Sequence, residues 1–168
     1  LETRPLGFHT DGILVATIQA DLVPPEGRQA LLADVLDRVR HEPSIAHAAL
    51  SSVPPVMNGP KLGQPIQAIS GEAPLPPRGA NAALNLISEG WFDTLGIGVV
   101  EGRDARADDR VGTPPVVVVN QTFVRTFVHG GSPIGRTVTL FLPGSPPPPV
   151  TIVGVVADTV YGSLRDRI

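Results

Sequence analysis

The sequence contains no cysteine, so disulfide bonds and thiolate metal sites are excluded. This absence leaves the redox compartment open, because a cysteine-free chain is compatible with a reducing cytoplasm and with an oxidising periplasm. Lysine is almost missing as well: Lys61 is the only one, and the net charge is −3. Since too few basic residues are present to neutralise a run of phosphates, we expect no nucleic-acid partner.

Long hydrophobic runs are also lacking. A membrane-spanning helix needs about 20 consecutive apolar residues, whereas the apolar runs here are short, such as residues 116–119, and no signal peptide is recognisable. The chain starts at Leu1 rather than at Met, and we expect it to be a piece of a longer protein whose membrane segments lie elsewhere. What is present is a chain of 168 residues that is 42% hydrophobic, which is enough for one or two compact cores.

The first third of the chain has the pattern strand, helix, strand. Residues 12–22 are rich in β-branched and aliphatic residues and predict a strand, and residues 44–53 predict a second one. Between them, residues 26–43 carry apolar residues at helical spacing, so they predict an amphipathic helix with Pro25 in its first turn and Pro43 beyond its end. Asp34 and Arg38 lie four residues apart and form a supporting pair. A crossover of this length favours parallel strands, as in one half of a split βαβ domain.

Residues 54–79 are loaded with proline and glycine, and only residues 65–69 suggest a short strand. We interpret this stretch as a connector between two lobes. The predicted organisation is therefore a first lobe over residues 1–55, a connector over residues 56–80, and a second lobe over residues 81–168.

The second lobe begins with a strand, a short helix and a further strand. Residues 82–87 predict the first strand, Ser88 the N-cap of a helix over residues 89–95, and residues 97–100 the next strand. Gly96 is expected to close the helix in a left-handed conformation.

Further along, the four valines of residues 116–119 predict a strand covered on both faces, and Asn120 is expected to cap a helix over residues 121–128 whose Phe123 and Phe127 share one side. A turn over residues 129–136 leads to strands at residues 137–142 and 150–157, which we interpret as a β-hairpin with a proline-stiffened tip.

No catalytic or metal-binding constellation is recognisable. The four histidines, His9, His41, His47 and His129, share no ligand spacing. The acidic cluster of Asp104, Asp108 and Asp109 has the oxygen ligands that calcium prefers, but Arg103, Arg106 and Arg110 are interleaved with it and are expected to pair with the acids, so a solvated turn is the favoured interpretation. We predict no catalytic, cofactor-binding or metal site.

Three further features resemble functional motifs but do not predict a site. The sequence GGSPIGRT at residues 130–137 lacks the lysine and the spacing of a phosphate-binding loop, so it does not predict ATP binding. Ser132 fails the pattern of a serine hydrolase because Ile134 occupies the position of the second glycine. Trp91 and Phe92 have the chemistry of a binding platform, but aromatic residues in a short helix above a sheet are more often part of a core.

A series of short blocks, in a fixed order, carries a family resemblance. The blocks are GFHTD at 7–11, ILVATI at 13–18, SIAHAALSS at 44–52, GWF at 90–92, TLGI at 94–97, GR at 102–103, VVN at 118–120, IG at 134–135 and IVGVV at 152–156. In this order they resemble the extracytoplasmic core domain of MacB-like and FtsX-like ABC transporter permeases, and the match covers most of the chain. Gly98 and Ala105 depart from the pattern, since proline and an aromatic residue are common at these two positions.

The resemblance implies an α+β fold with two lobes: a porter-like lobe, represented here by one βαβ half, and a smaller mixed lobe called sabre-like. The second porter half is not recognisable in this sequence. The resemblance also implies a non-catalytic periplasmic domain of an inner-membrane permease that transmits conformational change, with the connector as a candidate hinge. The implied partners are an ABC ATPase subunit and the membrane helices of the same permease, with a periplasmic adaptor protein as a further candidate.

A rival hypothesis belongs to a different class of protein. The narrow sheet expected in the first lobe would leave a strand edge unpaired, and such an edge can bind an extended peptide by strand addition. The chain would then be a free-standing soluble module that binds a peptide or a small molecule. An enzyme is a third and weaker alternative, because no catalytic constellation is present.

Overall fold

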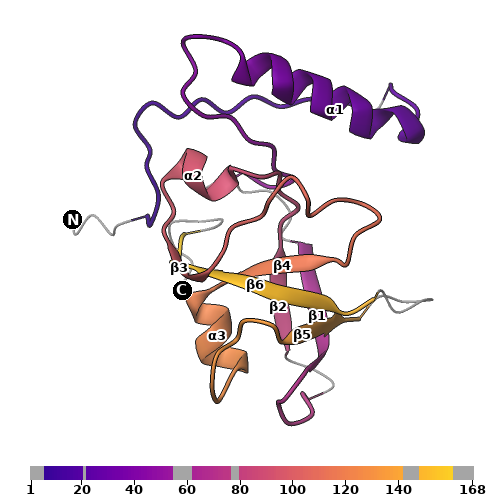
Figure 1. Ribbon diagram of the computed structural model, residues 1–168, viewed down its shortest axis with the longest axis vertical. Coiled ribbons are helices and arrows are strands. Elements are labelled where there is room, and N and C mark those ends of the chain that lie inside the picture. The colour runs from indigo at the N-terminus through magenta and orange to yellow at the C-terminus, as the bar shows by residue number, and fades with distance from the viewer. Residues whose placement is uncertain (1–5, 21, 55–61, 77–79, 142–147, 161–168) are drawn as a thin grey trace.

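The computed structural model describes residues 6–20, 22–54, 62–76, 80–141 and 148–160. The elements follow one another as α1 (Pro25–Arg40), β1 (Leu62–Ile69), β2 (Asn81–Leu84), α2 (Trp91–Leu95), β3 (Val99–Gly102), β4 (Val116–Asn120), α3 (Gln121–Phe127), β5 (Thr137–Leu140) and β6 (Val150–Val156). Figure 1 shows α1 at one end of the molecule, the sheet at the other, and α2 between them. The mixture of helices with a largely antiparallel sheet confirms the predicted α+β class.

The described strands form one sheet of six strands in the order β2-β1-β5-β6-β3, with β4 paired to β6. Strand β6 pairs with three others: β5 and β3 are antiparallel to it, and β4 is parallel to it. In the register of the antiparallel pairs, Thr137 of β5 lies opposite Thr151 of β6, and Val99 of β3 lies opposite Val156 of β6. The last strand of the described chain is therefore the centre of the sheet.

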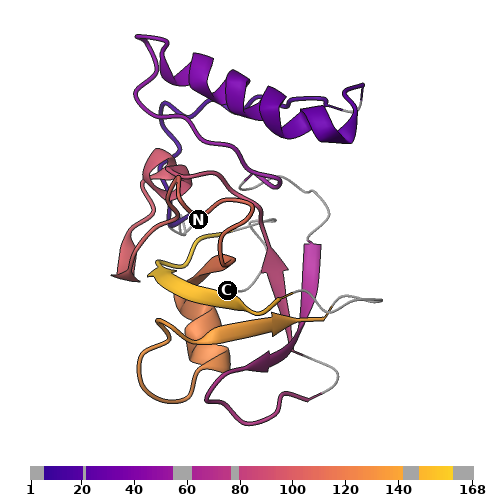
Figure 2. The same ribbon diagram turned by 45° about the vertical axis from the view of Figure 1, so that its right-hand side comes forward.

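The main core lies where β6 meets its neighbours. Ile152 has an exposed fraction of 0%, and buried residues from β1, β4 and β5 surround it: Ile66, Ile69, Val119 and Val138. Helix α3 packs against this cluster through Phe123 and Phe127, whose ring centroids lie 5.1 Å apart. Figure 2 shows α3 against one face of the sheet. The predicted strand, cap and helix at residues 116–128 are confirmed, because the Asn120 side chain accepts the N–H of Phe123 at 2.9 Å.

A second core joins α2 to the first residues of the chain. Trp91, Leu95, Ile97 and Val156 are buried together, and Phe8, Ile13, Ala49, Ile87, Phe92 and Val118 pack around them. The interpretation of Trp91 as a core residue is confirmed. Because Phe8 and Ile13 come from the N-terminal segment and Val156 from the central strand, this core connects the two ends of the described chain.

Helix α1 confirms the sequence prediction in its position and its pattern. Pro25 occupies the first turn, the helix ends at Arg40 before Pro43, and Arg38 pairs with Asp34 at 3.0 Å. No residue of α1 is buried, and its apolar residues, Leu31, Leu32, Val35, Leu36 and Val39, are all half-exposed. An amphipathic helix normally packs its apolar stripe against a core, so α1 presents an apolar face that the described residues cover only in part.

The two strands predicted beside α1 are wrong. Residues 13–20 belong to no helix or sheet, and Leu14 and Leu22 are 89% and 99% exposed. In the segment of residues 44–53, the only ladder contact among the described residues is an isolated bridge from Ser51 to Ile87. A β-branched composition favours an extended backbone, but a strand also needs a hydrogen-bonded neighbour. Neither segment has such a neighbour over its length, so the βαβ half is not formed as predicted.

The proline-rich stretch contains more regular structure than its composition suggested. The short strand predicted at residues 65–69 is confirmed and extends from Leu62 to Ile69, where it pairs with both β2 and β5. Pro65 is tolerated because it lacks only a donor, and its carbonyl accepts the N–H of Phe141 at 2.8 Å. Part of the predicted connector therefore belongs to the sheet, while the division of the chain into two lobes stays a prediction. The tip of the confirmed β5–β6 hairpin, residues 142–147, lies outside the described residues.

Candidate functional site

The N-terminal segment is fastened to the residues that follow β6. The N–H of Val160 donates to the carbonyl of Leu6 at 2.9 Å, and Val160 is only 3% exposed. Gly7 has φ +79°, and a Cβ added to it would lie 2.4 Å from the carbonyl oxygen of Asp158. Only glycine fits here, because the backbone is left-handed and the two segments touch. We call the contact between residues 6–9 and residues 158–160 the terminal clamp.

The same segment is held by the end of α2. The N–H of His9 donates to the carbonyl of Leu95 at 2.8 Å. Gly96 closes α2 with φ +66°, as predicted, and a Cβ added to it would lie 2.4 Å from the His9 ring. The cap glycine therefore serves two purposes: it ends the helix, and it gives room for the N-terminal segment.

Asp158 also connects the end of β6 to α3. Its carboxylate accepts the N–H of Thr122 at 2.7 Å and the hydroxyl of Thr122 at 2.9 Å, and it pairs with Arg125 at 2.6 Å. Burial acts to raise the pKa of the Asp158 carboxyl, but the hydrogen bonds from Arg125 and Thr122 outweigh burial and hold this pKa below its ordinary value. The clamp is thus anchored on the helix that covers the sheet.

Arg40 forms a second joint, at the end of α1. Its guanidinium pairs with the Glu89 carboxylate at 2.8 Å, donates to the Glu89 carbonyl at 2.9 Å, and donates to the Ala48 carbonyl at 3.1 Å. The side chains of Arg40 and Glu89 are 33% and 35% exposed, so water has access to this joint. We call these contacts the α1 latch.

A third joint connects the segment after α1 with β2. The Asn85 side chain accepts the N–H of Val53 and donates to the Val53 carbonyl, both at 2.9 Å. Next to it, the N–H of Ser52 donates to the carbonyl of Leu86 at 2.8 Å. The N-terminal region therefore reaches the rest of the fold through the terminal clamp, the α1 latch and this amide pair, together with the apolar contacts of the second core.

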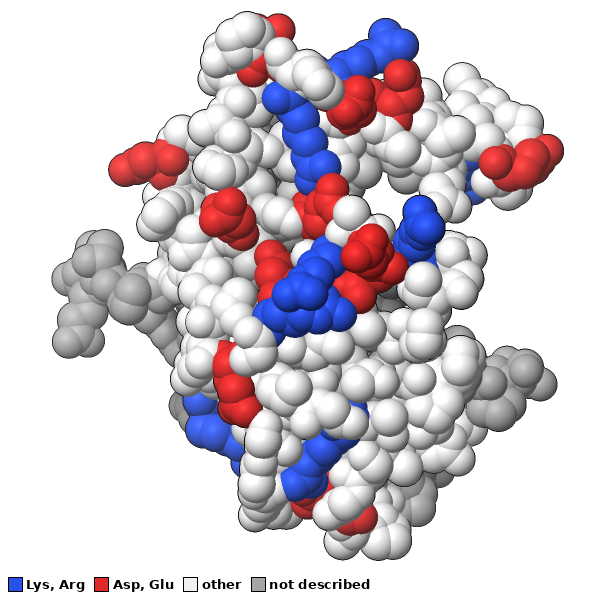
Figure 3. Space-filling model, in the orientation of Figure 1, with Lys and Arg blue, Asp and Glu red and all other residues white. Residues whose placement is uncertain are grey.

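The acidic cluster forms a turn closed by an ion pair, as predicted. Arg103 makes two hydrogen bonds with the Asp109 carboxylate, at 2.7 and 2.8 Å, and the N–H of Arg106 donates to the same carboxylate at 2.8 Å. The hydrogen bond from Arg103 lowers the pKa of the Asp109 carboxyl. Figure 3 shows acidic and basic side chains side by side on this face of the molecule.

Asp104 differs from its neighbours in the turn. Its carboxylate accepts the N–H of Ala105 at 2.5 Å, and the described residues contain no basic side chain in a salt bridge with it. Burial raises the pKa of the Asp104 carboxyl, the Ala105 N–H opposes the rise, and the negative charge of Asp93 adds to it.

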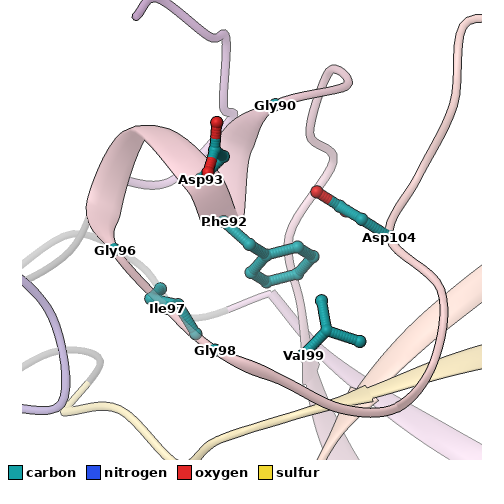
Figure 4. Close-up of a pocket in the computed structure, with 8 residues that line it drawn as sticks. All are labelled: Gly90, Phe92, Asp93, Gly96, Ile97, Gly98, Val99 and Asp104. Atoms are coloured by element: carbon teal, nitrogen blue, oxygen red, sulfur yellow. The ribbon is translucent and has the colours of Figure 1, made fainter.

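Asp104 lies beside a hollow of about 620 Å³ between α2 and β3. The hollow is lined by Gly90, Phe92, Asp93, Gly96, Ile97, Gly98, Val99 and Asp104. In Figure 4 the ring of Phe92 lies between Val99 and Asp104. Phe92 therefore contributes both to the edge of the second core and to the wall of this hollow.

The four histidines lie apart and in different environments. His9 packs against the α2 cap, His41 bonds back to the Asp37 carbonyl at 2.7 Å, and His47 lies 3.3 Å from the Asp93 carboxylate. The backbone N–H of His129 donates to Glu72 at 3.1 Å. Among the described residues, no group of three or more histidine and carboxylate side chains has the arrangement of a metal site.

Other candidates have local structural partners. The Ser132 hydroxyl donates to Glu101 and accepts the N–H of Ile134, so it closes a turn. The prediction that Ser88 caps α2 is wrong. Its hydroxyl accepts the N–H of Leu50 at 2.9 Å, and the helix starts after Gly90. Residues of the clamp and of the latch were not singled out from the sequence as functional. Gly7 belongs to the GFHTD block and Arg40 to no block, and in neither case does the sequence reveal what the residue contacts.

The model of the MacB-like periplasmic core domain matches residues 8–168. The periplasmic region of MacB from Actinobacillus actinomycetemcomitans is 18% identical, with a TM-score of 0.50 over 77% of this chain and 52% of that one. The extracellular domain of the noncanonic ABC-type transporter YknZ from Gram-positive bacteria is 16% identical, with a TM-score of 0.51 over 77% of this chain and 58% of that one. No curated protein matches the sequence.

The fold and the matches define the class of protein: this is an extracytoplasmic domain of an ABC transporter permease. The chain belongs to the MacB-like periplasmic core domain family, which confirms the resemblance seen in the sequence. It spans a little more than half the length of each of the two solved structures. Within the described ranges, no helix has both the length and the apolar character needed to cross a membrane.

Proposed function

We propose that this domain transmits movements of membrane helices, driven by a separate ABC ATPase, to a substrate or a partner protein outside the inner membrane. The observation that carries the proposal is the family match over residues 8–168. The domain has a mechanical role in this proposal and no catalytic one. The permease's own membrane helices and the ATPase are its partners, and a periplasmic adaptor protein is a further candidate.

In this proposal the terminal clamp keeps the N-terminal segment fixed to the sheet while force is transmitted. A pull on residues 6–9 acts directly on Val160 and on the end of α2, because backbone hydrogen bonds join them. From Asp158 the force reaches α3 through Thr122 and Arg125. Packed elements joined in this way move as one body.

The α1 latch is the part that yields. The latch consists of the contacts of one side chain: Arg40 has an ion pair and a hydrogen bond with Glu89, just before α2, and a hydrogen bond with the Ala48 carbonyl. The Arg40 and Glu89 side chains are each about one third exposed. Exposed pairs of this kind contribute roughly 0–1 kcal/mol, so the latch can open and close without unfolding either side. The predicted hinge at residues 54–79 is compatible with such a movement, although residues 55–61 lie outside the described part of the chain and residues 62–69 belong to the sheet.

The half-covered apolar face of α1 supports a further part of the proposal. Leu14 and Leu22, which precede the helix, are exposed, and the apolar stripe of the helix is half-exposed. In a permease of this family, a second porter-like half from elsewhere in the same protein would cover this face.

The test is to lock the latch in the intact permease. Because the 168 residues contain no cysteine, Arg40 and Glu89 can be replaced by cysteines in the domain and joined with a short bismaleimide. We expect transport to stop on cross-linking while ATP hydrolysis continues, compared with the same double-cysteine variant without the reagent. A matched control joins Thr137 to Thr151, which are already paired in the β5–β6 hairpin. Unchanged transport after complete cross-linking at the latch would rule out movement between α1 and α2.

The location is tested separately. Membrane fractionation of the permease should recover it in the inner membrane, and protease added outside spheroplasts should cleave within this domain. Protection of the domain from external protease would overturn the proposed location.

A further inference from the structure

The hollow between α2 and β3 combines an apolar wall with two carboxylates. Phe92, Ile97 and Val99 supply the apolar part, while Asp93 and Asp104 supply the charges. Neither carboxylate forms a salt bridge with lysine or arginine among the described residues; the ionic contact recorded for Asp93 is with His47. Asp104 is half-buried without a salt bridge of its own, and the nearby charge of Arg103, which pairs with Asp109, offsets the cost of burial only in part. A ligand cation placed beside Asp104 would relieve the rest of that cost.

Strand β3, which starts in the hollow, supplies a second and independent observation. Its described ladder contacts are with β6, so its other edge is unpaired in the described structure. Val99 and Val100 are 43% and 56% exposed, and the other two residues of the strand are exposed as well. Natural sheet edges are commonly protected by charged side chains or proline; β3 contains no proline and a single charged residue, Glu101. Its shortness and the register shift between Val99 and Glu101 limit an added strand to a few residues.

The two observations favour the same occupant. An extended backbone can bond to the outer edge of β3, and one of its side chains can then enter the hollow at the start of the strand. The side chain that fits an apolar wall with a carboxylate at its end has an aliphatic stem and a cationic head. Arginine and lysine have this form, and arginine can also stack on the face of Phe92.

We propose that the β3 edge and the adjoining hollow bind a short extended segment of a partner protein, with an arginine or lysine side chain of that segment directed at Asp104. Asp104 is the principal anion, and Asp93 at the rim adds to the attraction. This inference concerns binding alone, so it stands or falls independently of the transmission of movement proposed above.

The test uses the 168-residue protein and defined probes. The first probe is the peptide acetyl-Thr-Val-Arg-Val-Thr-amide, and its control has citrulline in place of arginine, which keeps the shape and removes the charge. A third peptide carries N-methyl groups on alternate amides to block strand pairing, and hexylguanidinium represents a free organic cation. Binding is measured by calorimetry and by amide NMR shifts of residues 97–104.

Three variants locate the site. Asp104→Asn removes the proposed anion, and Asp108→Asn is the matched control, because Asp108 lies in the same turn but not in the hollow. Gly98→Val fills the hollow: a Cβ at Gly98 meets nothing within 4 Å, and the backbone is not left-handed. Thermal unfolding of each variant verifies that it is folded.

We expect the arginine peptide to bind the wild-type protein and the Asp108→Asn variant equally. We expect the affinity to fall roughly tenfold when Asp104→Asn replaces the wild-type protein or when citrulline replaces arginine in the peptide. The Gly98→Val variant should bind the arginine peptide more weakly, and the N-methylated peptide should bind the wild-type protein more weakly. Equal binding by Asp104→Asn, or by the citrulline peptide, would overturn the role of the charge. If hexylguanidinium binds as tightly as the peptide in a manner that depends on Asp104, the occupant is a small organic cation and the proposed protein segment is wrong.

Discussion

The terminal clamp makes a specific prediction about Gly7. In the variant Gly7→Ala, the new Cβ would lie 2.4 Å from the carbonyl oxygen of Asp158 and 3.1 Å from the Cα of Thr159. Both contacts are with backbone, so a side-chain rotation cannot remove them. We expect the N-terminal segment to move away from residues 158–160 and to lose the hydrogen bond between Leu6 and Val160.

The magnitude has two parts. A left-handed backbone disfavours a residue with a Cβ by about 1–2 kcal/mol, and φ at Gly7 is +79°. Loss of one backbone hydrogen bond adds about 0.5–1.5 kcal/mol. The free energy of unfolding of Gly7→Ala should therefore fall by about 2–3 kcal/mol.

Gly12 offers a matched control. Its φ is +75°, nearly that of Gly7, but a Cβ added to it would meet nothing within 4 Å. The variant Gly12→Ala therefore has the same backbone penalty and the same effect of alanine on the unfolded chain, without the clash. We expect it to lose only about 1–2 kcal/mol.

The assay is urea unfolding combined with hydrogen exchange. The Val160 amide, protected in the wild type by its bond to Leu6, should exchange roughly tenfold faster in Gly7→Ala, and it should be unchanged in Gly12→Ala. The reasoning is refuted if the two variants lose the same stability and Val160 exchanges at the wild-type rate in both.

Three further predictions concern the turn and the core. Arg103 lowers the pKa of Asp109, so their ion pair stabilises the fold above the ordinary carboxyl pKa. This stabilisation is lost as the pH falls through the lowered pKa. On acidification in this range, the urea midpoint of Asp109→Asn should therefore fall less than that of the wild type. Burial raises the pKa of Asp104, so its charge destabilises the fold at neutral pH. The variant Asp104→Asn should therefore raise the Tm at pH 7, while the control Asp108→Asn should leave the Tm within about a degree or two. An unchanged or lower Tm for Asp104→Asn would contradict the effect of burial. Ile152→Ala should lower the free energy of unfolding by about 2–5 kcal/mol in urea titration, because Ile152 is 0% exposed at the centre of the sheet; a loss below 1 kcal/mol would contradict its central place in the core.

The elements that the sequence predicted well are those whose signals are local. Helix α1 follows from its apolar spacing and its two flanking prolines, and the start of α3 follows from the single Asn120 cap. The left-handed Gly96 and the β5–β6 hairpin belong to the same group. In each of these the residues that determine the structure lie within a few positions of one another.

The elements that failed depend on a distant neighbour. The segment of residues 12–22 has the side chains of a strand, but no described neighbour completes a ladder with it. Conversely, β1 contains Pro65 and a flexible composition, yet β2 and β5 pair with it on both sides. Ser88 resembled a helix cap, but its hydroxyl is used by Leu50, which is 38 residues away in sequence.

The candidate site was the least predictable part for the same reason. Each of its joints connects residues far apart in the chain, such as Leu6 with Val160 or Arg40 with Glu89. The sequence identifies the family through the order of its blocks, but a single glycine or arginine does not reveal what it touches. The hollow beside Asp104 likewise exists only because the turn at residues 103–110 folds near α2.

The central position of β6 has a consequence for how the chain matures. In the described structure β3 and β4 pair only with β6, so residues 99–102 and 116–120 have no sheet partner until residues 150–156 are available. A chain that crosses a membrane from its N-terminus would present these valine-rich segments first and their common neighbour last. Long-range pairing of this kind slows folding, so in a domain exported from its N-terminus we expect the sheet to form only after β6 has emerged.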